Sequence, residues 1–214
     1  YLAKTNTRFH ASYATAFISP TLDDLYSSSS NPNVTPETSK SFEFGLRQSI
    51  NKRNSVNMTF FNDSRKDMIA LDANWIPQNS EKVHSRGLET ELNLGLPKNF
   101  NLALSHTWNE HYDQDNRPLI RRAKNKIKAT LTHTWKEKLD SLIGLYIRGR
   151  ATDTTLLKHT GGFTTIRAAF GYKYSNNLKL TLRAENLLDE EYEVIYANGT
   201  PGISGYAGFT YTFN

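Results

Sequence analysis

Hydrophobic and polar residues alternate along most of the chain. In residues 178–184, leucine and alanine occupy every second position, and Lys179, Thr181 and Arg183 lie between them. A period of two is that of a β-strand, whereas a helix repeats about every 3.6 residues. The same alternation predicts ten strands, at residues 8–17, 42–50, 56–60, 88–96, 100–105, 126–135, 141–151, 164–174, 178–184 and 207–213. Phe61 breaks the pattern, because it falls on the polar side of its segment.

The connections between these segments are of two lengths. Short turns rich in Asn, Lys and Pro are predicted at 50–54, 96–100, 135–139 and 174–178. Long loops are predicted at 18–40, 67–85, 112–125, 153–162 and 189–204. Short turns at one end of the strands and long loops at the other are typical of an outer-membrane β-barrel, whose strands of about ten residues are apolar toward lipid and polar toward the lumen. Alternation alone also leaves open an ordinary soluble β-sandwich.

The residue types within the alternating segments favour the barrel. The polar face repeatedly carries Arg, Lys and Glu in the middle of a strand, which requires a face with room for long side chains. Aromatic residues are expected on the apolar face near both ends of the strands, as in the two girdles of a membrane barrel. They are Trp135, Tyr172 and Tyr174 beside the short turns, and Tyr13, Phe17 and Trp108 toward the long loops. We therefore predict an all-β fold, a transmembrane antiparallel β-barrel.

The amino-acid composition excludes several other classes of protein for this chain. Of the 214 residues, 37% are hydrophobic and the mean hydropathy is −0.60, and no apolar run approaches the roughly 20 residues of a membrane-spanning helix. The absence of Cys from the sequence excludes a disulfide scaffold and a thiolate zinc site. The net charge of +5 shows no clustered basic face, so we expect no nucleic-acid partner.

The last residues carry a possible assembly signal. Gly208–Phe213 ends the chain in alternating aromatic residues and resembles the C-terminal signal of bacterial outer-membrane barrels, although Asn214 follows the final aromatic residue. The resemblance implies that the barrel-assembly machinery is a partner of the chain. A last strand that simply has an aromatic face would show the same sequence, without acting as a signal.

Three further stretches resemble motifs of one transporter family. Tyr13–Leu22 with Asp24–Tyr26 resembles a Phe-Arg-Ala-Pro box, Asn31–Ser41 an Asn-Pro-Asn-Leu box followed by Pro-Glu-x-Ser, and Glu185–Tyr192 the stretch Asn-Leu-Phe-Asp-Lys-Glu-Tyr. In this order and spacing, the chain resembles the C-terminal half of a TonB-dependent outer-membrane receptor.

That resemblance implies a plugged barrel of about 22 strands. Residues 1–214 would form its last ten strands, with the plug and the N-terminal strands outside this sequence. It further implies an integral protein of the bacterial outer membrane, in contact with the lipid bilayer and lipopolysaccharide. A TonB complex would act through the N-terminal region, and a surface lipoprotein is a further possible partner. The inward face would then grip a plug through mixed charges, among them Glu43, Glu89, Glu91, Glu185, Arg8, Arg47, Arg148, Arg167 and Arg183.

The expected cargo is cobalamin. Pro118–Lys124 resembles the stretch Pro-Leu-Leu-Arg-Arg-Ala-Lys of cobalamin receptors, although other receptors could share these residues. A haem or ferric-siderophore receptor is the alternative within the family. Haem receptors usually place a His between the first two boxes, and residues 18–31 hold none. The alternative from another class is a passive channel of ten strands closed on themselves.

The sequence offers no enzyme chemistry. It contains no nucleophile elbow, phosphate loop or zinc-protease motif, and Asp113 and Asp115 supply only one of the two acidic pairs that ten-stranded outer-membrane proteases need. His106 and His111 are five residues apart, so they would face opposite sides of a strand and share no metal. Residues 113–116 could bind Ca²⁺ or form a solvated loop tip. We expect no cofactor in this segment, although Ca²⁺ is possible in the intact receptor.

Ligand contacts are expected from the long loops and the upper inward wall. A bulky corrinoid needs apolar and aromatic contacts with a few hydrogen-bond donors. The candidates are Tyr26, Trp75, Tyr112, Arg150 and Tyr196. For each of them, loop packing or a place in a girdle is the simpler explanation.

Overall fold

A computed structural model describes residues 6–72, 74–79, 82–153 and 158–213. Ten long strands form one antiparallel sheet, in the order β1-β2-β3-β6-β7-β8-β9-β12-β13-β16. They are β1 (Thr7–Ile18), β2 (Glu37–Ser49), β3 (Ser55–Lys66), β6 (Val83–Gly95), β7 (Phe100–Tyr112), β8 (Asn125–Trp135), β9 (Leu139–Arg148), β12 (Phe163–Lys173), β13 (Leu178–Glu185) and β16 (Ser204–Tyr211). The ten predicted strands are confirmed.

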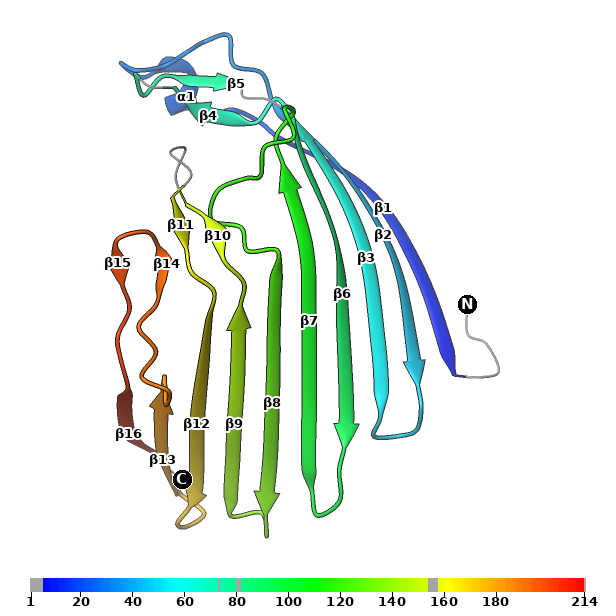
Figure 1. The fold of residues 1–214 in the computed structure, drawn as a ribbon, viewed down its shortest axis with the longest axis vertical. Helices are drawn as coiled ribbons and strands as arrows, with labels where there is room; N and C mark the ends of the chain where they lie inside the picture. The colour runs from blue at the N-terminus through cyan, green and yellow to red at the C-terminus, as the bar shows by residue number, and fades with distance from the viewer. Residues whose placement is uncertain (1–5, 73, 80–81, 154–157, 214) are drawn as a thin grey trace.

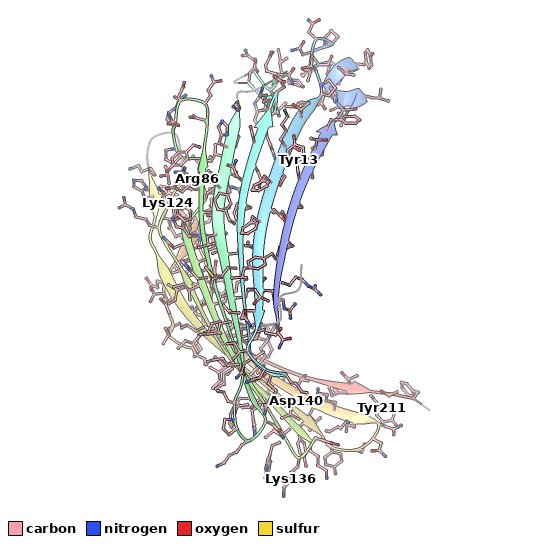
Figure 2. All side chains as sticks on the ribbon, turned by 90° about the vertical axis from the view of Figure 1, so that its right-hand side faces the viewer. Tyr13, Arg86, Lys124, Lys136, Asp140 and Tyr211 are labelled. Atoms are coloured by element: carbon pink, nitrogen blue, oxygen red, sulfur yellow. The ribbon has the colours of Figure 1, made fainter. Side chains whose placement is uncertain are left out.

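The sheet is a curved, open wall (Figures 1 and 2). Every long strand pairs with its neighbour along the chain, which is the up-and-down order of a barrel. In the described part of the chain, β1 and β16 lie at the two edges and do not pair with each other. The fold is therefore a section of barrel wall and not a closed ten-stranded barrel.

The cross-strand register keeps the two faces of the wall distinct. Phe44 lies opposite both Ala11 and Phe60, and Leu180 lies opposite both Tyr172 and Phe209. On the other face, Asn57 lies opposite both Arg47 and Glu91. Because directly opposite residues share a face, each strand extends an apolar and a polar surface started by its neighbour.

Phe61 lies on the polar face as the sequence indicates, and the structure supplies the reason. It is directly opposite Gly87, and a Cβ atom built on Gly87 would lie 2.5 Å from the Phe61 ring. The missing side chain of Gly87 provides the space that the ring occupies. The exception to the alternation is therefore a packing pair of two residues.

The two ends of the wall differ as predicted. At one end the strands are joined by short turns, in which residues with positive φ reverse the chain, among them Lys98, Asn99, Lys136 and Glu137. At the other end the connections contain α1 (Leu22–Tyr26), β4 (Ile69–Leu71), β5 (Pro77–Asn79), β10 (Ala151–Thr152), β11 (His159–Thr160), β14 (Glu193–Ile195) and β15 (Asn198–Gly199). Strands β3 and β7 continue well past residues 60 and 105, where alternation ends. Strands can pair above the apolar band without apolar side chains, so the sequence pattern underestimates the length of these two strands.

The helix α1 is short, and few hydrophobic side chains are buried in the part of the chain that the structure describes. Thr21 caps α1 by accepting a hydrogen bond from the Asp24 N–H at 3.1 Å, while the Asp24 carboxylate accepts from the Thr21 N–H at 2.8 Å. No helix among the described residues is long and apolar enough to cross a membrane. The buried hydrophobic residues are Val34, Ala123, Ala151 and Phe163. Most of them lie in or beside the long loops, which are consequently packed against one another.

Candidate ligand-binding site at the long-loop end

A buried carboxylate joins three of the long loops. Asp153 is 2% exposed, and its side chain accepts hydrogen bonds from Arg121 Nε at 2.5 Å and from the Tyr196 N–H at 2.6 Å. Arg121 also donates its backbone N–H to the Thr152 carbonyl at 2.6 Å. We call Arg121, Asp153 and Tyr196 the loop junction. It connects the β7–β8 loop, the β9–β12 connection and the β13–β16 loop, which are far apart in the sequence.

The electrostatics of the loop junction favour an ionised Asp153. Burial acts to raise the pKa of the Asp153 carboxyl, but the hydrogen bonds from Arg121 and Tyr196 outweigh it and hold that pKa below its usual value. At neutral pH the carboxylate is therefore charged and accepts both bonds. The Arg121 backbone has a positive φ of 61°, in the left-handed region that residues other than Gly seldom adopt.

An aromatic cluster lies beside the loop junction on the polar face of the wall. The Phe163 ring stacks on the Tyr192 ring with a centroid separation of 4.0 Å, and Tyr146 meets Phe163 edge-on at 5.8 Å. The Arg148 guanidinium, 6% exposed, lies 5.9 Å from the Phe163 centroid. Tyr192 comes from the β13–β16 loop, so this cluster fixes that loop against the inside of the wall.

The motif at residues 185–192 has a structural role in this loop. Asn186 is 6% exposed and donates to the carbonyls of Glu190 at 3.0 Å and Pro201 at 3.2 Å, while its side-chain oxygen accepts from the Glu190 N–H at 3.1 Å. Asp189 Oδ1 accepts from the Ile203 N–H at 2.8 Å. These bonds close the loop back toward the start of β16.

The loops between β1 and β2 and between β3 and β6 form a second packed group. Asn31 donates to the Pro77 carbonyl at 3.0 Å, and the Asn79 side chain accepts from the Thr35 N–H at 2.8 Å and donates to the Asp67 carbonyl at 2.7 Å. These contacts set α1 beside the β4–β5 hairpin, above the ends of the strands (Figure 1). Asn31 belongs to the second family box, which therefore serves to dock one loop on another.

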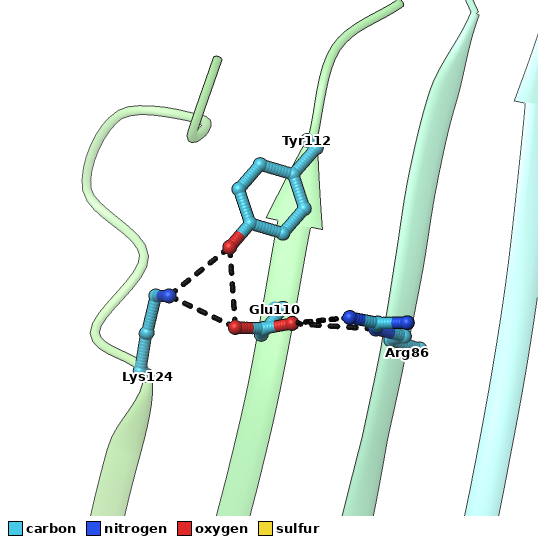
Figure 3. Close-up of polar contacts among 4 residues, drawn as sticks. All are labelled: Arg86, Glu110, Tyr112 and Lys124. Carbon is cyan, nitrogen blue, oxygen red and sulfur yellow. Dashed lines mark hydrogen bonds and ion pairs between the residues drawn. The ribbon is translucent and has the colours of Figure 1, made fainter. Parts of the chain in front are cut away.

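A polar cluster occupies the upper end of β6 and β7. Glu110 accepts from Arg86 Nη2 at 2.9 Å, Lys124 Nζ at 2.9 Å and the Tyr112 hydroxyl at 3.1 Å, and Lys124 also bonds that hydroxyl at 3.0 Å (Figure 3). Arg86 and Glu110 are directly opposite each other, two residues beyond the pair Leu88 and Trp108. The cluster therefore lies on the apolar face of the wall, above its apolar band, and not on the polar face.

The five candidate ligand residues fall into three places. Tyr26 and Trp75 are 74% and 73% exposed in the second packed loop group. Arg150 is exposed between β9 and β10, and Tyr196 is bonded through its N–H to Asp153, with Lys158 Nζ 5.8 Å from its ring centroid. Tyr112 belongs to the polar cluster on the outer side. All five lie at the long-loop end, but Tyr112 is separated from the others by the wall.

The acidic loop tip and the histidines offer no assembled metal site. Asp113 accepts from Arg117 Nε at 3.0 Å, and Asp115 also bonds the Arg117 guanidinium, so a cation would have to displace that side chain. The register places His106 on the apolar face and His111 on the polar face, as expected. Among the described residues, no group of three or more His, Cys, Asp or Glu side chains could hold a metal ion.

Sequence reasoning missed Asp153, Phe163 and Tyr192 as organisers of this end. Arg121 and Tyr192 stand in motifs quoted for the family, which marked these loops without revealing their partners. Asp153 and Phe163 carry no local signal, because their importance comes from contacts between loops that are distant in the sequence.

Comparison with known proteins agrees with this architecture. The family model described as TonB dependent receptor-like, beta-barrel matches residues 1–187. The vitamin B12 transporter BtuB of Vibrio vulnificus (strain YJ016) is 30% identical over 200 residues, covering 89% of this chain and 32% of that protein. The chain thus spans about a third of the length of this relative.

Solved structures share the fold at lower identity. The copper transporter OprC superposes with a TM-score of 0.83 and 16% identity, over 99% of this chain and 38% of that one. A mutant of the ferric enterobactin receptor PfeA from Pseudomonas aeruginosa gives a TM-score of 0.81 and 16% identity, over 100% of this chain and 39% of that one. Proteins of this family are integral outer-membrane transporters and not enzymes. With its open ten-stranded wall, packed long loops and matching family model, the chain belongs to the TonB-dependent receptor β-barrel family.

Proposed function

We propose that the receptor containing this chain binds cobalamin at the cell surface and imports it. The observation that carries the proposal is the 30% identity to a vitamin B12 transporter over 89% of the chain. The structural matches at 14–16% identity support the fold and leave the ligand open.

The long-loop end has the properties that such a ligand requires. Exposed aromatic side chains at Tyr26 and Trp75 offer apolar surface. The exposed Arg150 and Tyr196, which belongs to the loop junction, add polar groups. The loop junction fixes its three loops through buried bonds before any ligand arrives, so less conformational entropy is lost when the ligand binds. We assign ligand contact to Tyr26, Trp75, Arg150 and Tyr196, and to Tyr112 only for a ligand that reaches the rim of the wall.

Transport in this proposal needs parts outside the chain. A TonB complex would supply energy through the N-terminal region, and a plug would lie against the polar face of the wall. That face carries charges of both signs, including Arg47, Glu89 and Arg167, which can bond a plug and remain hydrated. Calcium in the intact receptor and a surface lipoprotein partner remain predictions.

Equilibrium binding to the full receptor tests the ligand. We expect saturable, sub-micromolar binding of cyanocobalamin and none of haem or of a ferric siderophore. Tyr26→Ala with Trp75→Ala should weaken cobalamin binding, whereas Tyr174→Ala should not, because Tyr174 is equally exposed (68%) but lies at the short-turn end. Saturable binding of haem or of a ferric siderophore, with no binding of cobalamin, would show that cobalamin is not the ligand. The assignment of the chain to its family would still stand.

A transport assay separates the receptor from a passive channel. Uptake of labelled cobalamin by cells that produce the full receptor should depend on TonB. Uptake that continues unchanged after TonB is deleted would contradict the active mechanism.

A further inference from the structure

The tip of the β13–β16 loop carries an asparagine that is followed by a glycine. Asn198 and Gly199 form β15, and the sequence contains no other Asn-Gly pair. Both residues are exposed, and the turn at Tyr196 and Ala197 joins them to β14 (Figure 1). Because Tyr196 belongs to the loop junction, this pair lies in solvent and directly beside a candidate ligand contact.

The backbone does not require a glycine at position 199. None of the described glycines has a positive φ, and a Cβ atom built on Gly199 would meet no heavy atom within 4 Å. Gly87 differs in this respect, because a Cβ atom there would lie 2.5 Å from the Phe61 ring. An alanine would therefore fit at position 199 without strain. The glycine leaves its backbone nitrogen unhindered beside the Asn198 side chain.

The hairpin that carries this pair is weakly held together. Its ladder consists of the pairs Glu193 with Gly199 and Ile195 with Asn198, and the register shifts between them. Ala197 in the turn has a φ of 63°, a left-handed conformation that is unfavourable for a residue with a side chain. A ladder this short opens locally more often than the long strands of the wall. The Asn198 side chain can therefore reach the backbone nitrogen of the next residue.

We propose that Asn198 is a site of spontaneous deamidation. The Gly199 backbone nitrogen attacks the carbonyl carbon of the Asn198 side chain, and the new C–N bond closes a cyclic imide. The bond from that carbon to the side-chain amide nitrogen breaks, and this nitrogen leaves as ammonia with the proton of the backbone N–H. Water then adds to either carbonyl of the imide and opens the ring. The product is aspartate or isoaspartate at position 198.

The product cannot make the contact that Asn198 makes. Asn198 Nδ2 donates to the Tyr196 carbonyl at 3.3 Å, and the Tyr196 N–H donates to Asp153 at 2.6 Å. An ionised carboxylate at position 198 has no proton to donate, so it repels that carbonyl. It also adds negative charge to a hairpin in which the Glu193 carboxylate already accepts from the Ala197 N–H at 3.0 Å. Conversion of Asn198 should consequently loosen Tyr196 and the loop junction.

The consequence for the ligand rests on the proposed function, in which Tyr196 contacts cobalamin. Loss of the Asn198 contact would lower the affinity of that site as the receptor ages. The change runs in one direction, because hydrolysis of the imide releases no amide that could restore Asn198. The deamidation itself depends only on the Asn-Gly pair and its exposure, and not on the identity of the ligand.

Peptide mass spectrometry of the full receptor, sampled over time in mildly alkaline buffer, tests the site. We expect the mass shift of amide-to-acid conversion at Asn198, together with isoaspartate that an isoaspartyl methyltransferase labels. Asn116 is the internal control, because it is also exposed in a long loop but is followed by Arg117. It should stay unconverted.

Gly199→Ala is the matched variant, since the added methyl group hinders the attack and the fold has room for it. Asn198 should remain unconverted in this variant over the same incubation. Intact Asn198 in the aged, unaltered receptor would overturn the proposal, and so would equal conversion with glycine and with alanine at position 199.

Asn198→Asp tests the structural consequence without ageing. Hydrogen exchange of the Tyr196 amide should be faster in this variant, and its affinity for cyanocobalamin should fall roughly three- to tenfold, as for the loss of one hydrogen bond. Gly199→Ala should change neither quantity. Unchanged exchange at Tyr196 would overturn the link between Asn198 and the loop junction. If the unaltered receptor binds no cobalamin, the proposed ligand is wrong, whereas the mass shift at Asn198 and the exchange at Tyr196 still decide this proposal.

Discussion

The wall and its loops are stabilised in different ways. Backbone hydrogen bonds between neighbouring strands hold the wall together, so a residue there needs only a polarity that suits its face. Leu182 and Thr181 are an example, because they are adjacent in β13 and face opposite sides of the wall. The loops depend on single side chains with several bonds each, such as Asp153 and Asn186. The wall should consequently tolerate many substitutions that preserve polarity, whereas the loops should be sensitive to the chemical identity of a few residues.

The largest effect is expected where a charge enters the lipid face. Leu182→Arg, in the middle of β13 between Phe170 and Ala207, should destabilise the barrel by about 2–4 kcal/mol, because lipid cannot solvate the guanidinium. The measurement is urea unfolding of the full receptor in lipid vesicles. Thr181→Arg is the control, since Thr181 lies on the polar face between Gly171 and Gly208, where there is room for a long side chain. Equal losses at the two positions would contradict the assignment of the faces.

In the loops, we expect the next largest effect at Asn186. Asn186→Ala removes three hydrogen bonds from a buried position and places alanine at a positive φ of 50°. The free energy of local opening should fall by about 1–3 kcal/mol. Hydrogen exchange of residues 187–203 measures that loss, with β13 as an internal reference that should stay protected. Uniform loss of protection in both regions would show that the loop and the wall are not separate stability units.

Ligand affinity should respond to the exposed aromatic residues of the loops. Tyr26→Ala with Trp75→Ala should weaken cobalamin binding by about 1–3 kcal/mol through lost apolar contact, while wall stability stays the same. Isothermal titration of the full receptor and the unfolding midpoint report the two quantities separately. A lower midpoint with unchanged affinity would assign these residues to loop packing.

The smallest effect is expected from acid acting on the loop junction. The pKa of Asp153 is lowered in the folded state, so the ionised carboxylate stabilises the folded loop junction. This stabilisation is complete above the ordinary carboxyl pKa of about 4, and it is lost as the pH falls through the lower pKa of the folded state. The distance between spin labels at Arg122 and Ala197 should be narrowly distributed at neutral pH and broaden at acid pH. In Asp153→Asn the distribution should already be broad at neutral pH; a narrow distribution in this variant would remove Asp153 from the junction.

The fold could be predicted from the sequence because its main physical rule is local. Alternation at residues such as Leu180 and Thr181 determines a face, and ten such segments with unequal connections determine an up-and-down wall. The exact strand ends could not be predicted, since β3 and β7 continue as paired backbone where side-chain polarity no longer alternates.

The site was predictable only as a region. The long-loop end followed from connection lengths, but the bond between Arg121 and Asp153 joins residues 32 positions apart and has no sequence pattern. Tyr112 illustrates the same limit: its place in the sequence suggested a ligand contact, and register with β6 places it on the outer side beside Glu110.

Site-directed spin labelling along β13 tests the central contrast most directly. The chain contains no Cys, so single cysteines can be introduced at residues 178–203 of this segment without background from it. In lipid vesicles, oxygen accessibility should be high at Leu180 and Leu182 and low at Thr181 and Arg183, with the alternation ending at Asn186. Alternation that continues through residues 186–203, or its absence from β13, would contradict the account of a period-two wall joined to loops fixed by individual bonds.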